Sequence, residues 1–225
     1  QHVTDMLRQH MAAVNVSDVS AFALVKADQY HAFFAHIAHR QAGAVAIAPA
    51  RPLHGRQHTL GTQFGQMPEA PINVNECGVL YSVDVVHGHK TGFYIDQRDS
   101  RHLLSELSND KEVLNMFCYT GGFSLAALKG GAKHVTSVDS SGEALAMAQR
   151  QMLLNGFDER RATWIDSDAF AVLTQLRKEE KQFDIVVLDP PSFAQNQASI
   201  LRALSSYERL ARLGLRLTAP DGTLL

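Results

Sequence analysis

The sequence predicts an α/β fold, with a Rossmann-like parallel sheet of the doubly wound type that follows a small α+β module. Two observations lead to this prediction. Short runs rich in apolar residues at 112–117, 134–138, 162–165 and 184–188 are typical of strands covered on both faces, as in a parallel sheet. Stretches with helical periodicity separate these runs, and the alternation of strands with helices favours parallel pairing.

The first run leads into a turn that contains two glycines. Tyr119, Thr120, Gly121 and Gly122 follow it, and the helical stretch 124–129 comes next and ends at a second glycine pair, 130–131. Glycines at such a turn let a ligand approach the backbone closely, and a helix start offers free amide donors to an anionic group. The strand, turn and helix together predict a ligand site.

Acidic residues follow the second and third runs. Asp139 lies 18 positions beyond Gly121, a spacing at which a carboxylate meets ribose hydroxyls in a doubly wound fold. Ser140 has capping-box spacing to Glu143, which predicts a helix start. Asp168, after the third run, is placed either to meet an adenine amino group or simply to cap the next helix, and a local role is also open for Asp139.

The fourth run ends in Asp189-Pro190-Pro191. Ligands of parallel sheets collect at the carboxyl ends of strands, and the prolines fix their own φ and bias Asp189 toward an extended conformation. We interpret this corner as a reaction site; the alternative is a strand-to-loop stop that happens to contain two prolines. A helix at 197–217 and the opening of a fifth strand at 221–225 complete the chain. We therefore expect a sheet truncated at its C-terminal strands, with 184–188 close to an unprotected edge.

The glycine pattern discriminates between two classes of nucleotide ligand. A dinucleotide site uses Gly-x-Gly-x-x-Gly to pass a pyrophosphate, and the turn at 119–123 has no third glycine at that spacing. The turn suits a ligand without phosphates, such as S-adenosylmethionine.

Four segments, at 87–101, 114–123, 137–141 and 188–193, resemble the class I methyltransferases related to the large-subunit rRNA cytosine carbon-5 methyltransferase I, and the resemblance covers roughly residues 71–225. It implies a class I methyltransferase sheet, S-adenosylmethionine as cofactor and RNA as partner, with ribosomal RNA as the expected kind. It places Gln97 and the turn around the methionine part, Asp139 at the ribose, and Asp189 where cofactor and target base meet. The implied cofactor-binding residues are Gln97, Phe117, Tyr119, Thr120, Gly121, Gly122, Asp139, Ser140, Asp168, Ala169 and Asp189, and the implied catalytic residues are Asp189, Pro190 and Pro191.

The carbon-5 reaction needs a nucleophilic thiolate, which in this family follows the fifth strand. The sequence has two cysteines, Cys77 and Cys118, and we expect neither to be that nucleophile. If no cysteine follows residue 225, transfer to a base nitrogen of guanine or adenine becomes the better interpretation. A NAD-dependent oxidoreductase and a non-catalytic RNA-binding module remain the alternatives from other classes.

Composition limits the partners. The 225 residues are 45% hydrophobic and 20% charged with a net charge of −2, which argues against a broadly basic nucleic-acid binder. RNA contacts must then be local, and we expect them from Arg51 and Arg56 in one segment and from Lys90, Arg98 and Arg101 beside the cofactor site; solvated loops are the alternative for both.

The chain divides into an α+β module at 1–70, for which RNA binding is one candidate role, a β-hairpin and connecting segment at 71–101 and the methyltransferase domain at 102–225. In the module we expect helices within 3–14 and 21–42 and a strand within 43–50. Its histidines at 31, 36 and 39 lack a recognisable ligand spacing, so no metal is expected. No apolar stretch is long enough to span a bilayer, and we expect a cytoplasmic protein, with a homodimer as one candidate assembly.

Overall fold

The computed structural model describes residues 44–47, 61–65, 71–84, 93–193 and 200–225, in two units, Gln1–Ala70 and Pro71–Leu225. In the first unit, β1 (Ala44–Ile47) pairs antiparallel with β2 (Gly61–Gly65), which confirms the strand predicted within 43–50. The expected helices of this module and its three histidines lie outside the described residues.

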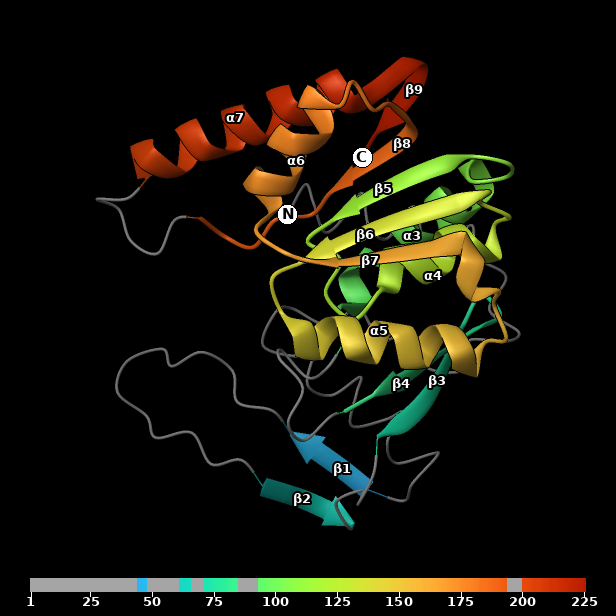
Figure 1. Ribbon diagram of the computed structural model, residues 1–225. Helices are drawn as coiled ribbons and strands as arrows, with labels where there is room; N and C mark the ends of the chain where they lie inside the picture. Colours follow the sequence, from blue (N-terminus) through green and yellow to red (C-terminus); the bar gives the residue numbers. More distant parts are fainter. Residues whose placement is uncertain (1–43, 48–60, 66–70, 85–92, 194–199) are drawn as a thin grey trace, which may run out of the picture. The chain divides into compact units, whose positions relative to one another are not determined.

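The second unit is built on a five-stranded parallel sheet (Figure 1). Its strands lie in the order β7-β6-β5-β8-β9, and every neighbouring pair is parallel. Their bounds are β5 (Glu112–Met116), β6 (His134–Asp139), β7 (Ala162–Asp166), β8 (Phe183–Leu188) and β9 (Thr218–Leu224). The predicted fold class is confirmed, and the four predicted strands agree with β5 to β8 within one residue at each end.

Helices cover both faces of this sheet (Figure 1). One face carries α4 (Gly122–Lys129) and α5 (Gly142–Leu154), and α3 (Arg98–Leu107) packs against α4. The other carries α6 (Ala169–Lys178) and α7 (Ile200–Leu217). Short 3-10 turns, η3 (Ile95–Gln97) and η4 (Glu159–Arg161), precede α3 and β7. The main core lies between the strands and α6 and α7; it includes Leu114, Met116, Val138, Leu173, Val186, Leu210, Leu213 and Leu217.

Strand β8 lies next to the edge strand of the described sheet, as expected, and is itself paired on both sides. Strand β9 is seven residues long and pairs with β8. Just beyond it, Leu188 N donates to Leu225 O at 2.8 Å, so β8 is an interior strand. Among the described residues the edge strand on this side is β9. It is irregular, with a register shift, Pro220 and a positive φ of 64° at Asp221, features that proteins tolerate at sheet edges.

The predicted hairpin is confirmed. Strands β3 (Ile72–Glu76) and β4 (Val79–Val83) pair antiparallel, and β4 lies against α4 and α5. The amide of Asn155 continues the outer side of β4: its Oδ1 accepts from Leu80 N at 2.7 Å, and its Nδ2 donates to Leu80 O at 2.7 Å. The hairpin thus packs within the same unit as the sheet.

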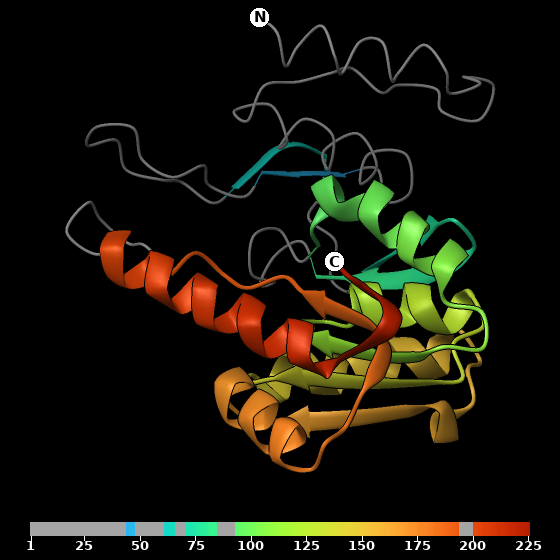
Figure 2. The same ribbon diagram turned by 90° about the horizontal axis from the view of Figure 1, so that it is seen from above.

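Helix α7 passes close to the sheet at Gly214. A Cβ placed there would lie 2.6 Å from Leu188 Cδ1 and 3.2 Å from Leu224 Cδ1, so a larger residue would require these leucine side chains to move. Figure 2 shows the N-terminal half of α7 extending past the ends of the strands. Among the described residues, no helix combines the length and apolar character needed to cross a bilayer.

Candidate active site

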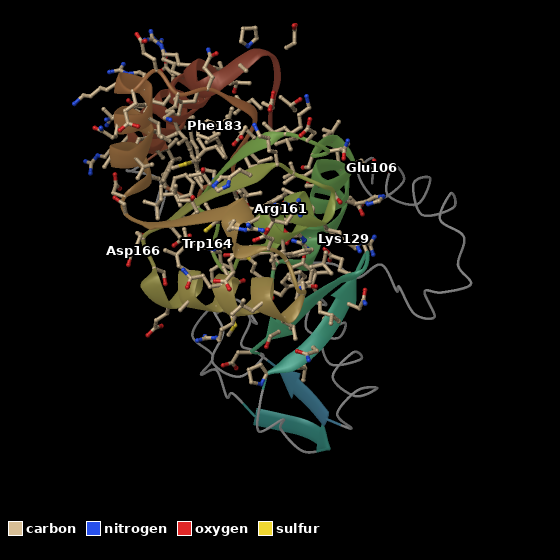
Figure 3. All side chains as sticks on the ribbon, turned by 45° about the vertical axis from the view of Figure 1, so that its right-hand side comes forward. Glu106, Lys129, Arg161, Trp164, Asp166 and Phe183 are labelled. Atoms are coloured by element: carbon tan, nitrogen blue, oxygen red, sulfur yellow. The ribbon has the colours of Figure 1, made fainter. Side chains whose placement is uncertain are left out.

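The candidate site residues gather where the strands end. Because all five strands are parallel, the turn after β5, Asp139 at the end of β6 and Asp189 after β8 share one edge of the sheet. Figure 3 shows Asp166, the last residue of β7, at this edge and Lys129, the last residue of α4, toward the opposite end.

The turn after β5 has a contorted backbone. Phe117, Tyr119 and Gly121 have positive φ values of 60°, 49° and 86°, a region that L-residues with side chains rarely adopt. Gly121 precedes α4 in the N-cap position, and no side chain caps this helix. A Cβ on Gly121 would lie 2.9 Å from Ala148 Cβ, so the turn is packed directly on α5. The first amides of α4 therefore lie beside a backbone that a ligand can approach closely.

Asp139 fixes the same turn through its carboxylate. Its Oδ2 accepts from Tyr119 N at 2.8 Å, and its Oδ1 accepts from Ser141 N at 2.9 Å. An ionised carboxylate offers about four lone-pair positions, so these two bonds leave capacity for ribose hydroxyls. The capping box predicted at Ser140 is wrong by one residue. Ser141 is the N-cap of α5 and accepts from Ala144 N at 3.2 Å, because the bond from Ser141 N to Asp139 turns the chain there.

Gln97 and Asp189 meet although 92 positions separate them. Gln97 Nε2 donates to Asp189 Oδ1 at 3.4 Å, which joins the end of η3 to the corner after β8. Tyr94 is close by: burial raises the pKa of its hydroxyl, and the negative charges of Asp189, Asp96 and Asp139 raise it further. The Tyr94 ring also packs edge-on against Tyr119, with ring centroids 5.5 Å apart. The predicted cofactor turn and the predicted reaction corner thus share one neighbourhood. Of the two prolines, Pro190 is half-buried and Pro191 is exposed.

An aromatic cluster lies next to this corner, and sequence analysis did not identify it. Phe193, four residues after Asp189, packs against Phe117, Phe170 and Tyr207, with ring centroids 6.4, 6.1 and 4.7 Å apart. Its backbone N also donates to Tyr207 Oη at 3.2 Å. The cluster joins the segment after β8 to the cofactor turn, to α6 and to α7.

Asp168 is the N-cap of α6, where its Oδ1 accepts from Ala171 N at 2.9 Å. The capping role considered for it is therefore present. Ala169 is the buried first residue of the same helix. Contact of these two residues with an adenine stays a prediction.

The RNA contact predicted for Arg101 is wrong. Its side chain is 3% exposed, and its guanidinium donates from Nε and Nη2 to the Glu76 carboxylate at 2.7 and 2.8 Å and from Nη1 to Tyr94 O at 2.8 Å. Arg101 instead links the hairpin to the segment before η3. Arg98 is on the surface at the start of α3 with Asp99 as an ion-pair partner, so its RNA contact stays a prediction. Lys90, Arg51 and Arg56 lie outside the described residues.

Two polar side chains, on α5 and on β4, donate hydrogen bonds to carbonyls of the glycine turn, and sequence analysis identified neither of them. Gln151, 1% exposed on α5, donates from Nε2 to Thr120 O at 2.8 Å and accepts from Ser82 N at 3.1 Å. Tyr81 Oη donates to Gly122 O at 3.3 Å. The hairpin and α5 thus hold the carbonyls of the glycine turn. A helical glutamine with this role has the same sequence signature as a solvent-exposed one.

The cysteines behave as expected. Cys118 is 4% exposed, and burial, aided by the nearby Asp139 charge, raises the pKa of its thiol well above the usual range. Cys77 is exposed in the β3–β4 turn. Its neighbour Gly78 lies near the end of the Lys129 side chain. Lys129 is the last residue of α4, so this turn is at the opposite end of that helix from the glycine turn. Neither is placed as a nucleophile at this site. Among the described residues, no three His, Cys, Asp or Glu side chains gather as a metal site would need.

These residues fit an S-adenosylmethionine group. The glycine turn gives close access to the backbone, the uncapped start of α4 offers amides to a carboxylate, and Asp139 has acceptor capacity for ribose hydroxyls. The described turn contains no further glycine that would let a pyrophosphate pass.

Comparison with known proteins agrees with this geometry. Residues 57–225 match the family model of S-adenosylmethionine-dependent methyltransferases. The chain is 46% identical over 177 residues to the Ribosomal RNA large subunit methyltransferase I of Vibrio vulnificus and 45% identical over 175 residues to that of Aeromonas salmonicida. In each case the match covers 78% of this chain and 45% or 44% of the relative, so the chain spans about half the length of these curated relatives.

Solved structures give the same result. A methyltransferase crystallised with SAH superposes with a TM-score of 0.65 at 32% identity, covering 72% of this chain and 43% of that one. A SAM-dependent methyltransferase from Streptococcus mutans gives the same TM-score and identity over 73% and 43% of the two chains. The family match, the relatives and the geometry of the glycine turn agree, and this chain belongs to the S-adenosylmethionine-dependent methyltransferase family.

Proposed function

We propose that this chain is the catalytic part of an enzyme that transfers a methyl group from S-adenosylmethionine to a base of large-subunit ribosomal RNA. The observation that carries the proposal is the contact of Gln97 Nε2 with Asp189 Oδ1, 3.4 Å, beside the cofactor turn. It supports the assignment of the polar, proline-stiffened corner to the target base, beside the turn assigned to the cofactor. The names and identities of the curated relatives support RNA as the substrate.

In this proposal each element has one task. The turn at Gly121 and the start of α4 receive the methionine part of the cofactor, Asp139 the ribose, and Asp168 with Ala169 the adenine. Asp189, Pro190 and Pro191, with Gln97, orient the target base. The cofactor supplies a methyl group that its sulfonium already activates, so the chain has mainly to align the two reactants. Good alignment corresponds to an effective molarity of order 10⁵ M, or about 7 kcal/mol of the barrier.

The position of methylation on the base depends on the nucleophile. Cytosine carbon 5 requires a thiolate, and the burial of Cys118 and the location of Cys77 make both unsuitable. A base nitrogen can attack with its own lone pair, held by Asp189 and the prolyl carbonyls. Carbon-5 transfer is therefore the proposal for a protein with a cysteine beyond residue 225, and nitrogen transfer is the proposal for one without it.

The test is methyl transfer from radiolabelled S-adenosylmethionine to large-subunit rRNA transcribed in vitro, which carries no modification. Asp189→Ala should lower transfer by at least about 10³-fold while the affinity for S-adenosylhomocysteine stays within about tenfold. Asp158→Ala, which removes an exposed carboxylate near the start of β7, is the matched control and should transfer normally. Chromatography of the digested RNA then identifies the methylated atom.

Other outcomes have clear meanings. A fully active Asp189→Ala variant would remove this residue from the mechanism. Calorimetric binding of NAD in place of S-adenosylhomocysteine would favour the oxidoreductase. A wild type that binds cofactor and RNA but transfers no methyl group would favour the non-catalytic RNA-binding module.

A further inference from the structure

A groove of about 400 Å³ lies between α6 and α7, on the face of the sheet opposite α4 and α5. Its lining is rich in guanidinium and hydroxyl groups; the polar members are Thr174, Arg177, Ser205, Arg209, Arg212 and Arg216, with one glutamate, Glu208. None of these residues belongs to the cofactor site. The groove is a second concentration of polar side chains in this unit.

The groove has a strong local charge. Four arginines face one glutamate in a chain whose net charge is −2. Arg212 pairs with Glu208 at 2.7 Å, whereas Arg177 and Arg216 have no ion-pair partner among the residues that the structure describes. Arg212 and Arg216 lie four positions apart on one helix, a spacing at which like charges destabilise the helix. Arg177 and Arg216 lie in the last turns of α6 and α7, where the helix dipole favours a cation, and an anionic ligand would give their charges a partner.

The residues of α7 that line the groove are spread over about three turns of the helix, which suits a ligand with several phosphates. From Ser205 to Arg216 the helix rises about 16 Å, at 1.5 Å per residue. One strand of a double helix carries a phosphate about every 3.4 Å along the helix axis, and an unstacked single strand spaces its phosphates more widely, so this distance corresponds to at most about five nucleotides. A single phosphate or a mononucleotide would occupy only part of it. Arginine suits such a ligand because its planar guanidinium can bind a phosphate with two hydrogen bonds.

The groove is also connected to the reaction corner. Arg209 Cζ lies 5.1 Å from the centroid of the Phe170 ring, and Phe170 packs on Phe193 in the aromatic cluster. Phe193 follows Asp189 by four residues. Arg177 and Arg216 lie in the last turns of α6 and α7, toward the edge where the strands begin, so a strand bound there reaches the target-base corner by running back along α7 past Arg209.

We propose that the α6–α7 groove binds the phosphate backbone of the RNA strand that carries, or directly flanks, the target base. This inference rests on the proposed methylation of RNA. The arginines fix the strand through its phosphates and read no sequence, and selection of the base is left to the corner at Asp189.

The test compares two double charge reversals of equal size in the full 225-residue chain. Arg177→Glu with Arg216→Glu changes the groove, and Lys133→Glu with Arg150→Glu changes exposed residues elsewhere on the surface. Binding of a labelled single-stranded RNA 20-mer of mixed sequence is measured by fluorescence anisotropy from about 50 to 300 mM KCl. Calorimetry with S-adenosylhomocysteine checks the cofactor site of each variant.

The groove variant should bind the RNA at least about tenfold more weakly at low salt, and its slope of log K against log salt should be shallower by about 1.4, or 0.7 per lost phosphate contact. The control variant should bind within about twofold of the wild type. Arg177→Lys with Arg216→Lys keeps both charges and should retain most of the slope. All variants should bind S-adenosylhomocysteine like the wild type, since the groove is separate from that site.

Equal RNA binding by the groove variant and the control would overturn the groove proposal and leave the methyltransferase assignment intact. A wild type that binds S-adenosylhomocysteine but no RNA would overturn both the groove and the RNA substrate. If poly-glutamate, added to the wild type at a charge concentration equal to that of the RNA, displaces the RNA, the groove accepts any polyanion. The proposed partner would then be an acidic protein and not RNA. Loss of S-adenosylhomocysteine binding by the groove variant, with retention by the lysine variant, would assign the arginines to folding and also contradict the proposal.

Discussion

Gly121→Ala tests the cofactor turn most directly. The new Cβ would meet two obstacles: a backbone φ of 86°, and Ala148 Cβ at 2.9 Å. An L-residue in the left-handed region costs about 1–2 kcal/mol, and overpacking in a closed site adds about 1–3 kcal/mol. The free energy of unfolding should therefore fall by about 2–5 kcal/mol, and the turn must shift to accommodate the methyl group.

Gly156→Ala is the matched control because it isolates the first cost. Gly156 has a φ of 65° but no atom within 4 Å of its ideal Cβ. We expect a loss of about 1 kcal/mol in urea denaturation and no change in affinity for S-adenosylhomocysteine. Gly121→Ala should bind this ligand at least about tenfold more weakly, which calorimetry measures, because displacement of the turn by the crowded Cβ disturbs the backbone that the ligand approaches.

A second substitution separates crowding from backbone conformation at Gly121. Ala148→Gly removes the contacting Cβ but costs about 1 kcal/mol because glycine is a poor helix former. Once this cost is subtracted, the double variant Gly121→Ala with Ala148→Gly should recover part of the stability lost in Gly121→Ala. If Gly121→Ala and Gly156→Ala lose the same stability and bind the ligand equally well, the close packing of the turn on α5 has no energetic role and this reasoning is refuted.

Two further predictions concern the hairpin and its neighbours. Glu76→Ala leaves the buried Arg101 guanidinium without its carboxylate and should lower the free energy of unfolding by about 3 kcal/mol in urea; a loss below about 1 kcal/mol would contradict a buried pair. Burial raises the pKa of Tyr81 and Tyr94 above the usual 10.0. As the pH rises, the unfolded chain therefore loses these protons before the folded chain does. The free energy of unfolding that the two protonated hydroxyls contribute below pH 10 is lost above it. Denaturation at pH 8 and about 11 should show this fall, and Tyr81→Phe should reduce it; the same fall in the variant would argue against Tyr81 as its source.

The parallel sheet and the location of the site were predictable because both depend on local patterns. Strand-like runs followed by glycines or acidic residues place Gly121, Asp139 and Asp189 at one edge by topology alone. Family resemblance alone implied that Gln97 and Asp189 both belong to the site, and their direct contact was not predicted, since nothing local connects residues 92 positions apart.

The errors arose where long-range pairing decides the role of a polar residue. Arg101 follows a basic segment and looks like a phosphate ligand, but Glu76 in the hairpin neutralises it inside the unit. Gln151 looks like an ordinary polar helix residue, and its two bonds become apparent only when β4 and the glycine turn lie on either side. The arginines of α7 look like a solvated face until α6 adds Arg177 opposite them.

The close approach of α7 at Gly214 has a mechanical consequence. Leu188, whose Cδ1 packs against this point of the helix, directly precedes Asp189, so a change of packing at Gly214 would be felt at the end of β8 that carries the reaction corner. The part of a ligand's ordering cost that concerns the distance between helix and carboxylate would then be met by packing formed when the chain folds.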